Sequence, residues 1–273
     1  MSREEIKHIV THYFRKLKKL YKSIDPNFDV DAIHDFRVSY KKLRAFFRLV
    51  SAETNDELKV PRKLKKVYKA LGVIRDMQLQ RQKFKGTVKP KQPQAYLTKL
   101  SREIKRQKEE LLERFSDDII TESKKKIVAS LPSKLGNSSS RDFIRKKQSG
   151  NQVIITSGDF SDDNLHSIRK NLKDIYYIQE ISLENENKRI STQKKKIKEK
   201  GPAKEFLDSM GDFQDKRTGI SLIRNSWLMQ FAKNEQALLI QIKQGWMKDK
   251  ANMKRTLVRK LKSLNHQTSK FGD

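Results

Sequence analysis

Residues 33–50 read IHDFRVSYKKLRAFFRLV, and their spacing is the first sign of how this chain folds. Apolar residues recur on one face at helical spacing, while a histidine, arginines and lysines follow another strip of the same helix. Between Arg37 and Val50 there are five cations and no acid. Surface helices usually carry both signs of charge, so a partner outside this helix must supply the negative charge.

The composition predicts an all-α protein that does not cross a membrane. Only 10 glycines and 6 prolines occur in 273 residues, which favours long helices over a turn-rich β architecture. No run of about 18 apolar residues is present, and the charged N-terminus lacks the apolar segment of a secretory signal. The absence of cysteine excludes disulfides and thiolate metal sites. We therefore expect a cytoplasmic protein.

The excess of positive charge points to a polyanionic partner. The chain has 62 lysines and arginines against 33 aspartates and glutamates, a formal net charge of +29. Such an excess attracts polyanions to the folded protein. Nucleic acid, an anionic membrane surface and a phosphate-rich polymer or metabolite all fit, and charge alone does not choose among them.

Apolar periodicity predicts two helical halves joined by a polar segment. The first half ends at Pro132, and helical patterns resume at Asn164. The segment between them, residues 133–163, is rich in Ser, Asn and Gly, and its stretch NQVIITS suits a short strand or an extended chain. The predicted domains are residues 1–132 and residues 164–273, with this polar linker between them. The predicted helices cover residues 3–22, 31–50, 60–84, 95–131, 164–181, 203–231 and 237–264.

The same spacing of a histidine, an arginine and a lysine occurs twice in the chain. Because an α-helix turns by about 100° per residue, the offsets 0, 3 and 7 fall within about 60° of arc, and each trio forms one strip along its helix. Arg44 and Arg48 extend the first strip. The two trios are His34, Arg37 and Lys41, and His166, Arg169 and Lys173.

A second shared pattern follows each strip. The sequence LGVIRD contains Gly72, 38 residues after the first histidine, and MGDFQD contains Gly211, 45 residues after the second. Two matched patterns in the same order indicate an internal duplication with one loop insertion. We expect these glycines to permit close helix packing or a kink, not the approach of a ligand.

The order of these motifs, HDxRVxxKKLR, LGxxRD, LHxxRKxxKxxxY and GxxQD, resembles the CHAD domain, the conserved histidine α-helical domain. The resemblance extends over roughly residues 4–264. It implies two pseudo-symmetric four-helix bundle halves around a basic central cavity. It also implies binding of inorganic polyphosphate, often in association with polyphosphate granules.

The resemblance carries over residues of both strips and their neighbours. We expect Lys42, Arg48 and Lys170 at the rim of the site, and Arg75 to join it through the next helix. The predicted polyphosphate-binding residues are His34, Arg37, Lys41, Lys42, Arg44, Arg48, Arg75, His166, Arg169, Lys170, Lys173 and Tyr177.

The sequence departs from the family at three of these positions or their neighbours. Arginines are usual where Lys41 and Lys42 stand, and lysine keeps the charge but loses the bidentate fork. An arginine or lysine is commoner where Tyr176 stands, so we expect the second strip to grip less tightly. The strongest contacts are expected from Arg37, Lys41, Arg44, Arg169 and Lys173.

The chemistry of the strips suits a linear polyphosphate. Cations that repeat with the helical turn of about 5.4 Å form a row, and both arginine and lysine bind phosphate oxygens. Two such strips are expected to face one another and enclose the polymer. Clustered cations disfavour protonation of His34 and His166, and a polyanion restores it, so these histidines are expected to protonate when ligand binds. A purely structural role for them stays equally open.

The alternative is a general nucleic-acid or polyanion-binding helical protein. Lysine-rich runs at residues 63–66 and 194–200 suit a phosphate backbone. Aromatic residues make up only 8% of the chain, and no base-reading motif is visible. A peripheral membrane protein would need a helix with an aromatic and leucine face opposite its lysines, and none is evident.

No catalytic, metal or cofactor site is expected. Residues 184–188, ENENK, match a pattern of triphosphate-tunnel enzymes, but they follow a helix where that pattern needs a barrel strand. His8 and His12 have the spacing of zinc ligands without a third ligand. We therefore predict a non-enzymatic polyphosphate-binding protein of the cytoplasm or of polyphosphate granules. A polyphosphate-metabolising enzyme is left open as a protein partner.

Overall fold

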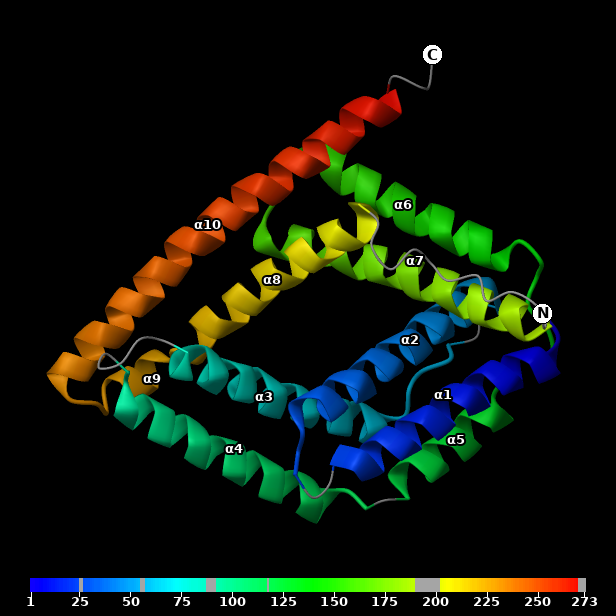
Figure 1. Cartoon of the computed structure of the whole chain (residues 1–273). Helices are drawn as coiled ribbons and strands as arrows, with labels where there is room; N and C mark the ends of the chain where they lie inside the picture. Colours follow the sequence, from blue (N-terminus) through cyan, green and yellow to red (C-terminus); the bar gives the residue numbers. More distant parts are fainter. Residues whose placement is uncertain (25–26, 55–56, 87–91, 117, 190–201, 270–273) are drawn as a thin grey trace. The chain divides into compact units, whose positions relative to one another are not determined.

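The protein is built from helices (Figure 1). Within the part of the chain that the structure describes there are ten helices and no strand, which confirms the all-α prediction. The computed structural model describes residues 1–24, 27–54, 57–86, 92–116, 118–189 and 202–269. The helices are α1 Arg3–Ile24, α2 Val30–Thr54, α3 Arg62–Lys85, α4 Gln94–Arg114, α5 Ile119–Ala129, α6 Ser139–Ser157, α7 Asp162–Arg189, α8 Pro202–Leu222, α9 Asn225–Leu228 and α10 Lys233–Ser269.

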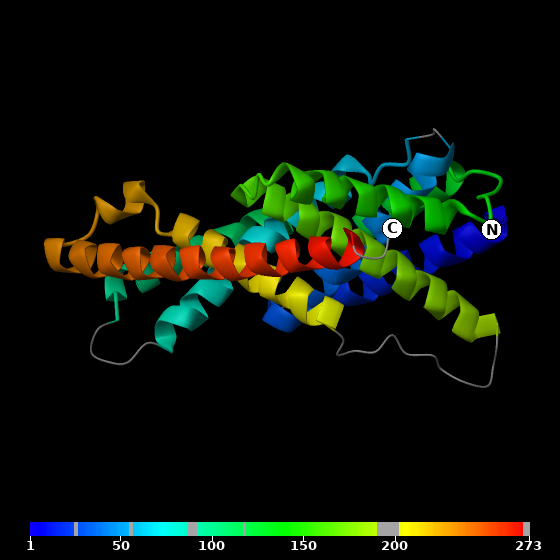
Figure 2. The same cartoon turned by 90° about the horizontal axis from the view of Figure 1, so that it is seen from above.

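These helices form two compact units. The N-terminal unit contains residues Met1–Ser139 and Leu222–Ile240, and the C-terminal unit contains Ser140–Ser221 and Gln241–Asp273. The N-terminal unit therefore consists of α1–α5, α9 and the first residues of α10. The C-terminal unit consists of α6, α7, α8 and the remainder of α10, which is one uninterrupted helix (Figure 2).

Residues 222–240 pack with α4 although they come late in the chain. The carboxylate of Glu235 accepts a hydrogen bond from the backbone N–H of Tyr96 at 2.7 Å. The hydroxyl of the same tyrosine donates to the carbonyl of Leu222 at 3.3 Å. The sequence-based division placed this segment in residues 164–273, because such contacts leave no periodic signal in the sequence.

The N-terminal unit is held together by the apolar stripes of its helices. The predicted stripe of α1, which includes Ile6, Phe14 and Tyr21, is buried along its whole length. α1 packs on α2 and α5, and α3 packs on α2, α4 and α5. Full burial of one large apolar side chain contributes about 1.5–3 kcal/mol. The largest fully buried aromatic side chains are Tyr13, Tyr40, Tyr96, Phe14, Phe36, Phe46, Phe47 and Phe84.

The helix predicted over residues 95–131 is two helices, and the prediction of a single one was wrong. α4 ends at Arg114, Phe115 is extended with φ −134° and ψ 115°, and α5 begins at Ile119. Asp118 precedes the first residue of α5, and its side chain makes no capping hydrogen bond there. The apolar periodicity runs through this break, and a pattern search therefore does not detect it.

The predicted linker contains the helix α6, so NQVIITS is neither a strand nor an extended chain. The preference of β-branched residues for strands is weak, and packing overrides it. Asn151 of α6 is buried and accepts a hydrogen bond from Asn171 Nδ2 of α7 at 2.9 Å. Lys147 lies 3.4 Å from the carboxylate of the buried Asp174. These polar contacts with α7 stabilise the segment as a helix.

The C-terminal unit has its own apolar core, formed by α7, α8 and α10. Partly buried Ile154 and Ile155 of α6 pack against it, which accounts further for the helical state of that segment. The core residues are Phe160, Leu165, Ile168, Phe206, Met210, Phe213, Leu257 and Leu261.

An ion-pair cluster joins the start of α7 to α10. Asp162, in the first turn of α7, accepts hydrogen bonds from Lys250 Nζ at 2.8 Å and Lys254 Nζ at 3.0 Å. Burial raises the pKa of this carboxyl, but the hydrogen bonds and charges of the two lysines outweigh burial and hold the pKa below its usual value. A negative charge in the first turn also favours the helix dipole.

We predict that Asp162→Asn lowers the free energy of unfolding by about 1–2 kcal/mol at pH 7, because the neutral amide loses the charge attraction to two lysines and keeps only one acceptor oxygen. The control is Asp163→Asn, since the Asp163 side chain is 85% exposed against 23% for Asp162, and its loss is expected to change stability by less than about 0.5 kcal/mol. Urea unfolding measures both. The folded pKa is depressed, so the stabilisation is present above the unfolded pKa of Asp162 and disappears as pH falls through the folded value. An equal loss in both variants would contradict this role.

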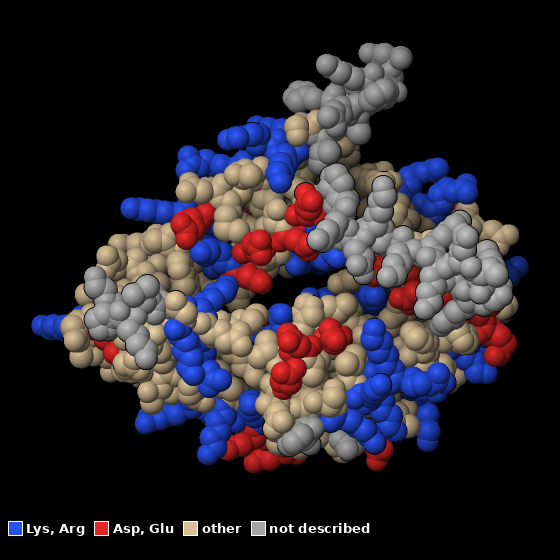
Figure 3. Space-filling model, viewed as in Figure 1, with Lys and Arg blue, Asp and Glu red and all other residues tan. Residues whose placement is uncertain are grey.

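The charge excess of the sequence is visible on the surface. On the face drawn in Figure 3, lysine and arginine side chains cover more area than acidic ones. Over the described residues, no helix has the length and apolarity that a bilayer crossing requires.

Candidate functional site

The first strip lies on α2, whose start is fixed by Asp29. Asp29 Oδ1 accepts hydrogen bonds from the backbone N–H groups of Asp31 at 3.0 Å and Ala32 at 2.8 Å, as a helix N-cap does. The apolar face of α2 is buried in the N-terminal unit, so the strip is presented on another side. Along it, His34 and Arg44 are exposed, and the half-buried members are Arg37, Lys41 and Arg48.

Arg37 of this strip is seated on α3. Its Nη1 donates a hydrogen bond to the carbonyl oxygen of Tyr68 at 2.8 Å, and its Cζ lies 4.5 Å from the centre of the Tyr68 ring. Tyr40 of α2 stacks on the same ring, with centroids 4.1 Å apart. Burial raises the pKa of Tyr40 to about 12, so its phenol stays neutral and supplies no negative charge to the strip. Arg44 lies in the same strip without an acidic partner among the described residues.

Gly72 makes this position of Arg37 possible. A Cβ atom at residue 72 would lie 2.8 Å from Arg37 Cζ and closer still to its Nη1. Real Cβ atoms essentially never approach another heavy atom below 3.0 Å, so any other residue at this position displaces the guanidinium. The close packing expected at this glycine is therefore the packing of an arginine side chain against a helix.

The second strip repeats this arrangement in the C-terminal unit. Arg169 of α7 lies against Gly211 of α8, and a Cβ atom at residue 211 would be 3.3 Å from Arg169 Nη2. The approach is looser than at Gly72 by this measure. Each unit thus contains one strip arginine that lies over a glycine of another helix, and this agreement supports the internal duplication.

Each histidine lies near the residue that follows the glycine of its own unit by three positions. This residue is Arg75 for His34 and Gln214 for His166. His34 is exposed as a residue, but partial desolvation of its ring first, and then the charge of Arg75, lowers its pKa. Burial lowers the pKa of His166, the charges of Lys170 and Arg169 lower it further, and a hydrogen bond with Gln214 partly opposes them. At neutral pH both imidazoles are therefore mainly uncharged in the protein without ligand.

Several polar atoms of the second strip and of Arg75 on α3 are buried and have no hydrogen-bond partner among the described residues. They are Nε of Arg75, Nε of Arg169 and Nδ1 of His166. A buried donor without an acceptor costs about 1–3 kcal/mol, so such atoms are rare in proteins unless a ligand or water uses them. Within the residues that the structure describes, no ion pair joins Arg37 or Lys170 to a carboxylate.

Two of the predicted contacts lie elsewhere than expected. Lys42, expected at the rim, is buried with 9% exposure, because it lies about 140° around the helix from Arg37. Tyr177 is also buried, and Lys173 lies over it, with Nζ 6.0 Å from the ring centre. The same Nζ is 5.7 Å from the ring of Tyr176. Burial and the charge of Arg169 lower the pKa of Lys173.

The two strips differ beyond their shared trio. Ten and fourteen residues after the first histidine stand Arg44 and Arg48, whereas Tyr176 and Glu180 stand at the same offsets from the second. The second strip is thus less positive at its far end. Glu180 raises the pKa of Lys173, although burial and Arg169 outweigh it.

Sequence reasoning missed two residues that position the strips. Gln214 is part of MGDFQD, so comparison with LGVIRD would have placed it beside the histidine, as Arg75 is in the first copy. Tyr68 carries no such signal, because Leu207 stands at the same offset before Gly211. Among the residues that the structure describes, no three His, Asp or Glu side chains gather as a metal site.

The repeated strip and its glycine are accompanied by a match to a known family. A family model described as the CHAD domain matches residues 8–224. The chain belongs to the CHAD family. This confirms the resemblance inferred from the motifs. CHAD domains are generally non-catalytic binding domains, and the family is associated with polyphosphate.

A solved CHAD structure supports the same fold. The chain is similar to the crystal structure of the CHAD domain from the plant Ricinus communis, with a TM-score of 0.72 and 11% sequence identity. The alignment covers 96% of this chain and 91% of the plant chain. At this identity the similarity establishes the CHAD fold and nothing finer. No curated protein matches the sequence.

Proposed function

We propose that this CHAD protein binds inorganic polyphosphate through the strips on α2 and α7. The observation that carries the proposal is the repeated row of cations, each with an arginine seated on a glycine of another helix. Over the described residues, no ion pair neutralises the strip cations Arg37, Arg44, Arg75, Arg169 and Lys170. A phosphate polymer supplies the negative charge that these side chains lack.

The geometry of a strip suits the regular charge of the polymer. Every phosphate unit carries a negative charge, and cations that recur with the helical turn of about 5.4 Å present donors at a comparable repeat. Arginine offers a planar fork for two phosphate oxygens, and lysine a point charge. The seat on Tyr68 fixes the Arg37 guanidinium before ligand arrives, which lowers the entropy lost on binding.

The alternative, general binding of nucleic acid, has less support in the strips. Single-stranded nucleic acid binds well to exposed aromatic rings on which bases stack. Tyr40 is fully buried and stacks on Tyr68, and Tyr177 is buried beneath Lys173, so these rings are already occupied. The predicted lysine run at residues 194–200 lies outside the described residues.

Competition binding at near-physiological salt tests the proposal. Labelled long-chain polyphosphate is displaced by unlabelled polyphosphate, duplex DNA or single-stranded RNA at matched phosphate concentration. Preference for polyphosphate by orders of magnitude is the expected result. Equal competition by all three, with affinities that fade together as salt rises, would indicate a general polyanion binder and overturn the proposal. The basic central cavity, the metabolising-enzyme partner and the cytoplasmic or granule location stay predictions.

A pH dependence follows from the histidines. We predict that affinity for polyphosphate rises as pH falls from 7.5 to about 5.5. If binding raises the pKa of a histidine by one unit, the affinity gained over this range is up to about tenfold. The sign follows from the free-state pKa values of His34 and His166, which lie below the usual 6.5, while a bound polyanion raises them. Binding therefore takes up protons.

Both histidines lie among charged groups that act on their pKa values. The charged groups around His34 are Arg75, Lys41, Asp31 and Asp35, and those around His166 are Arg169, Lys170 and Arg217. The control is the double variant His34→Gln, His166→Gln, for which the affinity should vary much less with pH. An unchanged pH profile in that variant would show that the histidines do not titrate with binding.

A further inference from the structure

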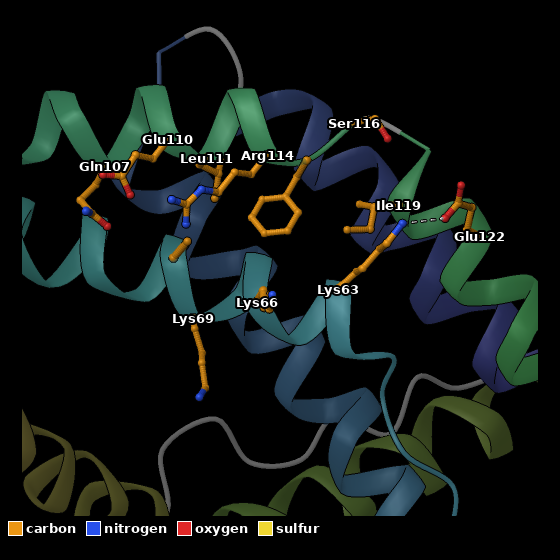
Figure 4. A pocket seen from close by; sticks show the side chains of 12 residues that line it. Lys63, Lys66, Lys69, Gln107, Glu110, Leu111, Arg114, Ser116, Ile119 and Glu122 are labelled. Carbon is orange, nitrogen blue, oxygen red and sulfur yellow. Dashed lines mark ion pairs between the residues drawn. The ribbon is translucent and has the colours of Figure 1, made fainter.

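The N-terminal unit contains a second group of cations, in a cavity that shares no residue with the strips. The cavity has a volume of about 570 Å³ and lies between α3, α4 and the start of α5 (Figure 4). On α3, Lys63 and Lys66 line it, whereas Gly72 lies about half a turn away from Lys63 around the helix. Lys69, which also lines the cavity, lies only about 60° from Gly72 around the helix, so the cavity and the seat of Arg37 use neighbouring sides of α3 and share no lining residue.

Three cations of this cavity have no acidic partner in the described ranges. Lys66 and Lys69 of α3 and Arg114 of α4 are exposed, and neither an ion pair nor a hydrogen bond engages them there. Of the two acids of the lining, Glu110 contacts Arg106 outside it, and Glu122 lies 4.0 Å from Lys63, a fourth cation of the lining. The lining thus has positive charge to spare. Part of this positive charge comes from residues 63–66 of α3, the lysine-rich run that the sequence suggested for binding a phosphate backbone.

The rest of the lining is apolar, which distinguishes this cavity from the strips. Leu111 and Ile119 are buried beneath it, and Ala70 and Phe115 are half-buried at its wall. In Figure 4, the side chains of Gln107 and Arg114 point from α4 toward α3, whereas the side chain of Lys69 points away from α4. A polyphosphate chain has no apolar part that would use such a wall. A ligand that fits has a phosphate and an apolar body.

We propose that this cavity binds a small organic phosphate of the nucleotide class. The flat base packs against Phe115 and Leu111, and the phosphate accepts hydrogen bonds from Lys66 and Arg114. Gln107 and Ser116 offer an amide and a hydroxyl to the polar edges of the ligand. The volume is in the range of about 300–1,000 Å³ that small-molecule sites occupy.

Calorimetric titration of the full chain with ATP and with inorganic triphosphate tests this site. The cavity variant is Lys66→Glu, Arg114→Glu. Its control is Lys65→Glu, Arg102→Glu, which makes the same charge change at exposed positions of the same two helices outside the lining. We expect the cavity variant to weaken ATP binding by about tenfold or more and the control to change it by less than about threefold. In the strip variant Arg37→Glu, Arg169→Glu, where polyphosphate binding by the strips is removed, we expect inorganic triphosphate to bind more weakly than ATP.

Four outcomes would overturn the proposal, and circular dichroism checks that both variants keep their helices. The first is no ATP binding by the native chain, and the second is an equal loss in cavity and control variants. The third is triphosphate binding as tightly as ATP in that strip variant, which would remove the role of the apolar wall. Polyphosphate affinity, measured in parallel, should be unchanged in the cavity variant. Fourth, if a charge reversal in the strips abolished ATP binding, the nucleotide would belong to the strips and the cavity would not be its site.

Discussion

Replacing Arg37 and Arg169 together by glutamate is expected to abolish measurable polyphosphate binding while the helix content stays that of the native protein. Each arginine contributes a charge-assisted contact of about 1.5–3 kcal/mol, and each glutamate adds repulsion of the ligand. The combined loss is about a hundredfold in affinity at the least. Fluorescence anisotropy with labelled long-chain polyphosphate measures the affinity, and far-ultraviolet circular dichroism measures the helix content.

The matched control separates the strips from the overall charge. Arg15→Glu, Arg259→Glu changes the net charge by the same amount at exposed positions of α1 and α10, one in each unit. This control is expected to lose less than about threefold, mainly at low salt, because distant charges are screened beyond about 8–10 Å. Survival of affinity in the strip variant, or an equal loss in the control, would show that the strips are not the site.

The single variants are expected to differ because the strips are unequal. Arg37 is followed along its strip by Lys41, Arg44 and Arg48, whereas the second strip has Tyr176 and Glu180 at its last two positions. Polymer bound along the first strip therefore depends on more cations in register. We expect Arg37→Glu alone to weaken binding more than Arg169→Glu alone, and both to weaken it less than the pair.

The sequence was a good guide where periodicity carries the information. The stripe of α1 and the strip of α2 follow directly from spacing, since helical neighbours recur at three and four residues. The internal repeat identified the arginines and the glycines together, and the family match confirms the resemblance drawn from them. These features are local, so one helix is enough to define each of them.

The features that the sequence did not predict depend on contacts between helices. The break after Arg114 lies in a continuous apolar pattern, and α6 is stabilised by Asn151 and Lys147 through partners on α7. Lys42 is buried where an exposed rim position was expected, although its angle to Arg37 was already available from the helical turn. Tyr68 holds Arg37 but has no counterpart in the second copy, so comparison of the copies does not reveal it.

Gly72→Ala is expected to weaken polyphosphate binding by about tenfold without unfolding the protein. The added methyl group occupies the position of the Arg37 guanidinium, which must leave Tyr68 and lose its hydrogen bond. Losing that bond costs about 0.5–1.5 kcal/mol, whereas alanine in a helix interior is about 0.5–1 kcal/mol more favourable than glycine. The two effects nearly cancel in stability, but only the first acts on binding. Urea unfolding and anisotropy measure the two quantities separately.

Two other glycines in helices provide graded controls for this prediction. A Cβ atom at Gly211 would lie 3.3 Å from Arg169 Nη2, so the arginine needs to move only a few tenths of an ångström. A Cβ atom at Gly245 meets nothing within 4 Å. We therefore expect the loss of affinity to decrease from Gly72→Ala to Gly211→Ala and to vanish for Gly245→Ala, while stability rises most in the last.

This order distinguishes a positioned arginine from a merely positive one. If Arg37 acted only through its charge, displacing its guanidinium by the width of a methyl group would change affinity little, because a point charge loses little energy over that distance in water. A fork that must meet two phosphate oxygens loses its geometry with such a shift. Native affinity in Gly72→Ala would therefore mean that the strip attracts the polymer by charge alone, and that the seat on α3 serves the fold and not the ligand.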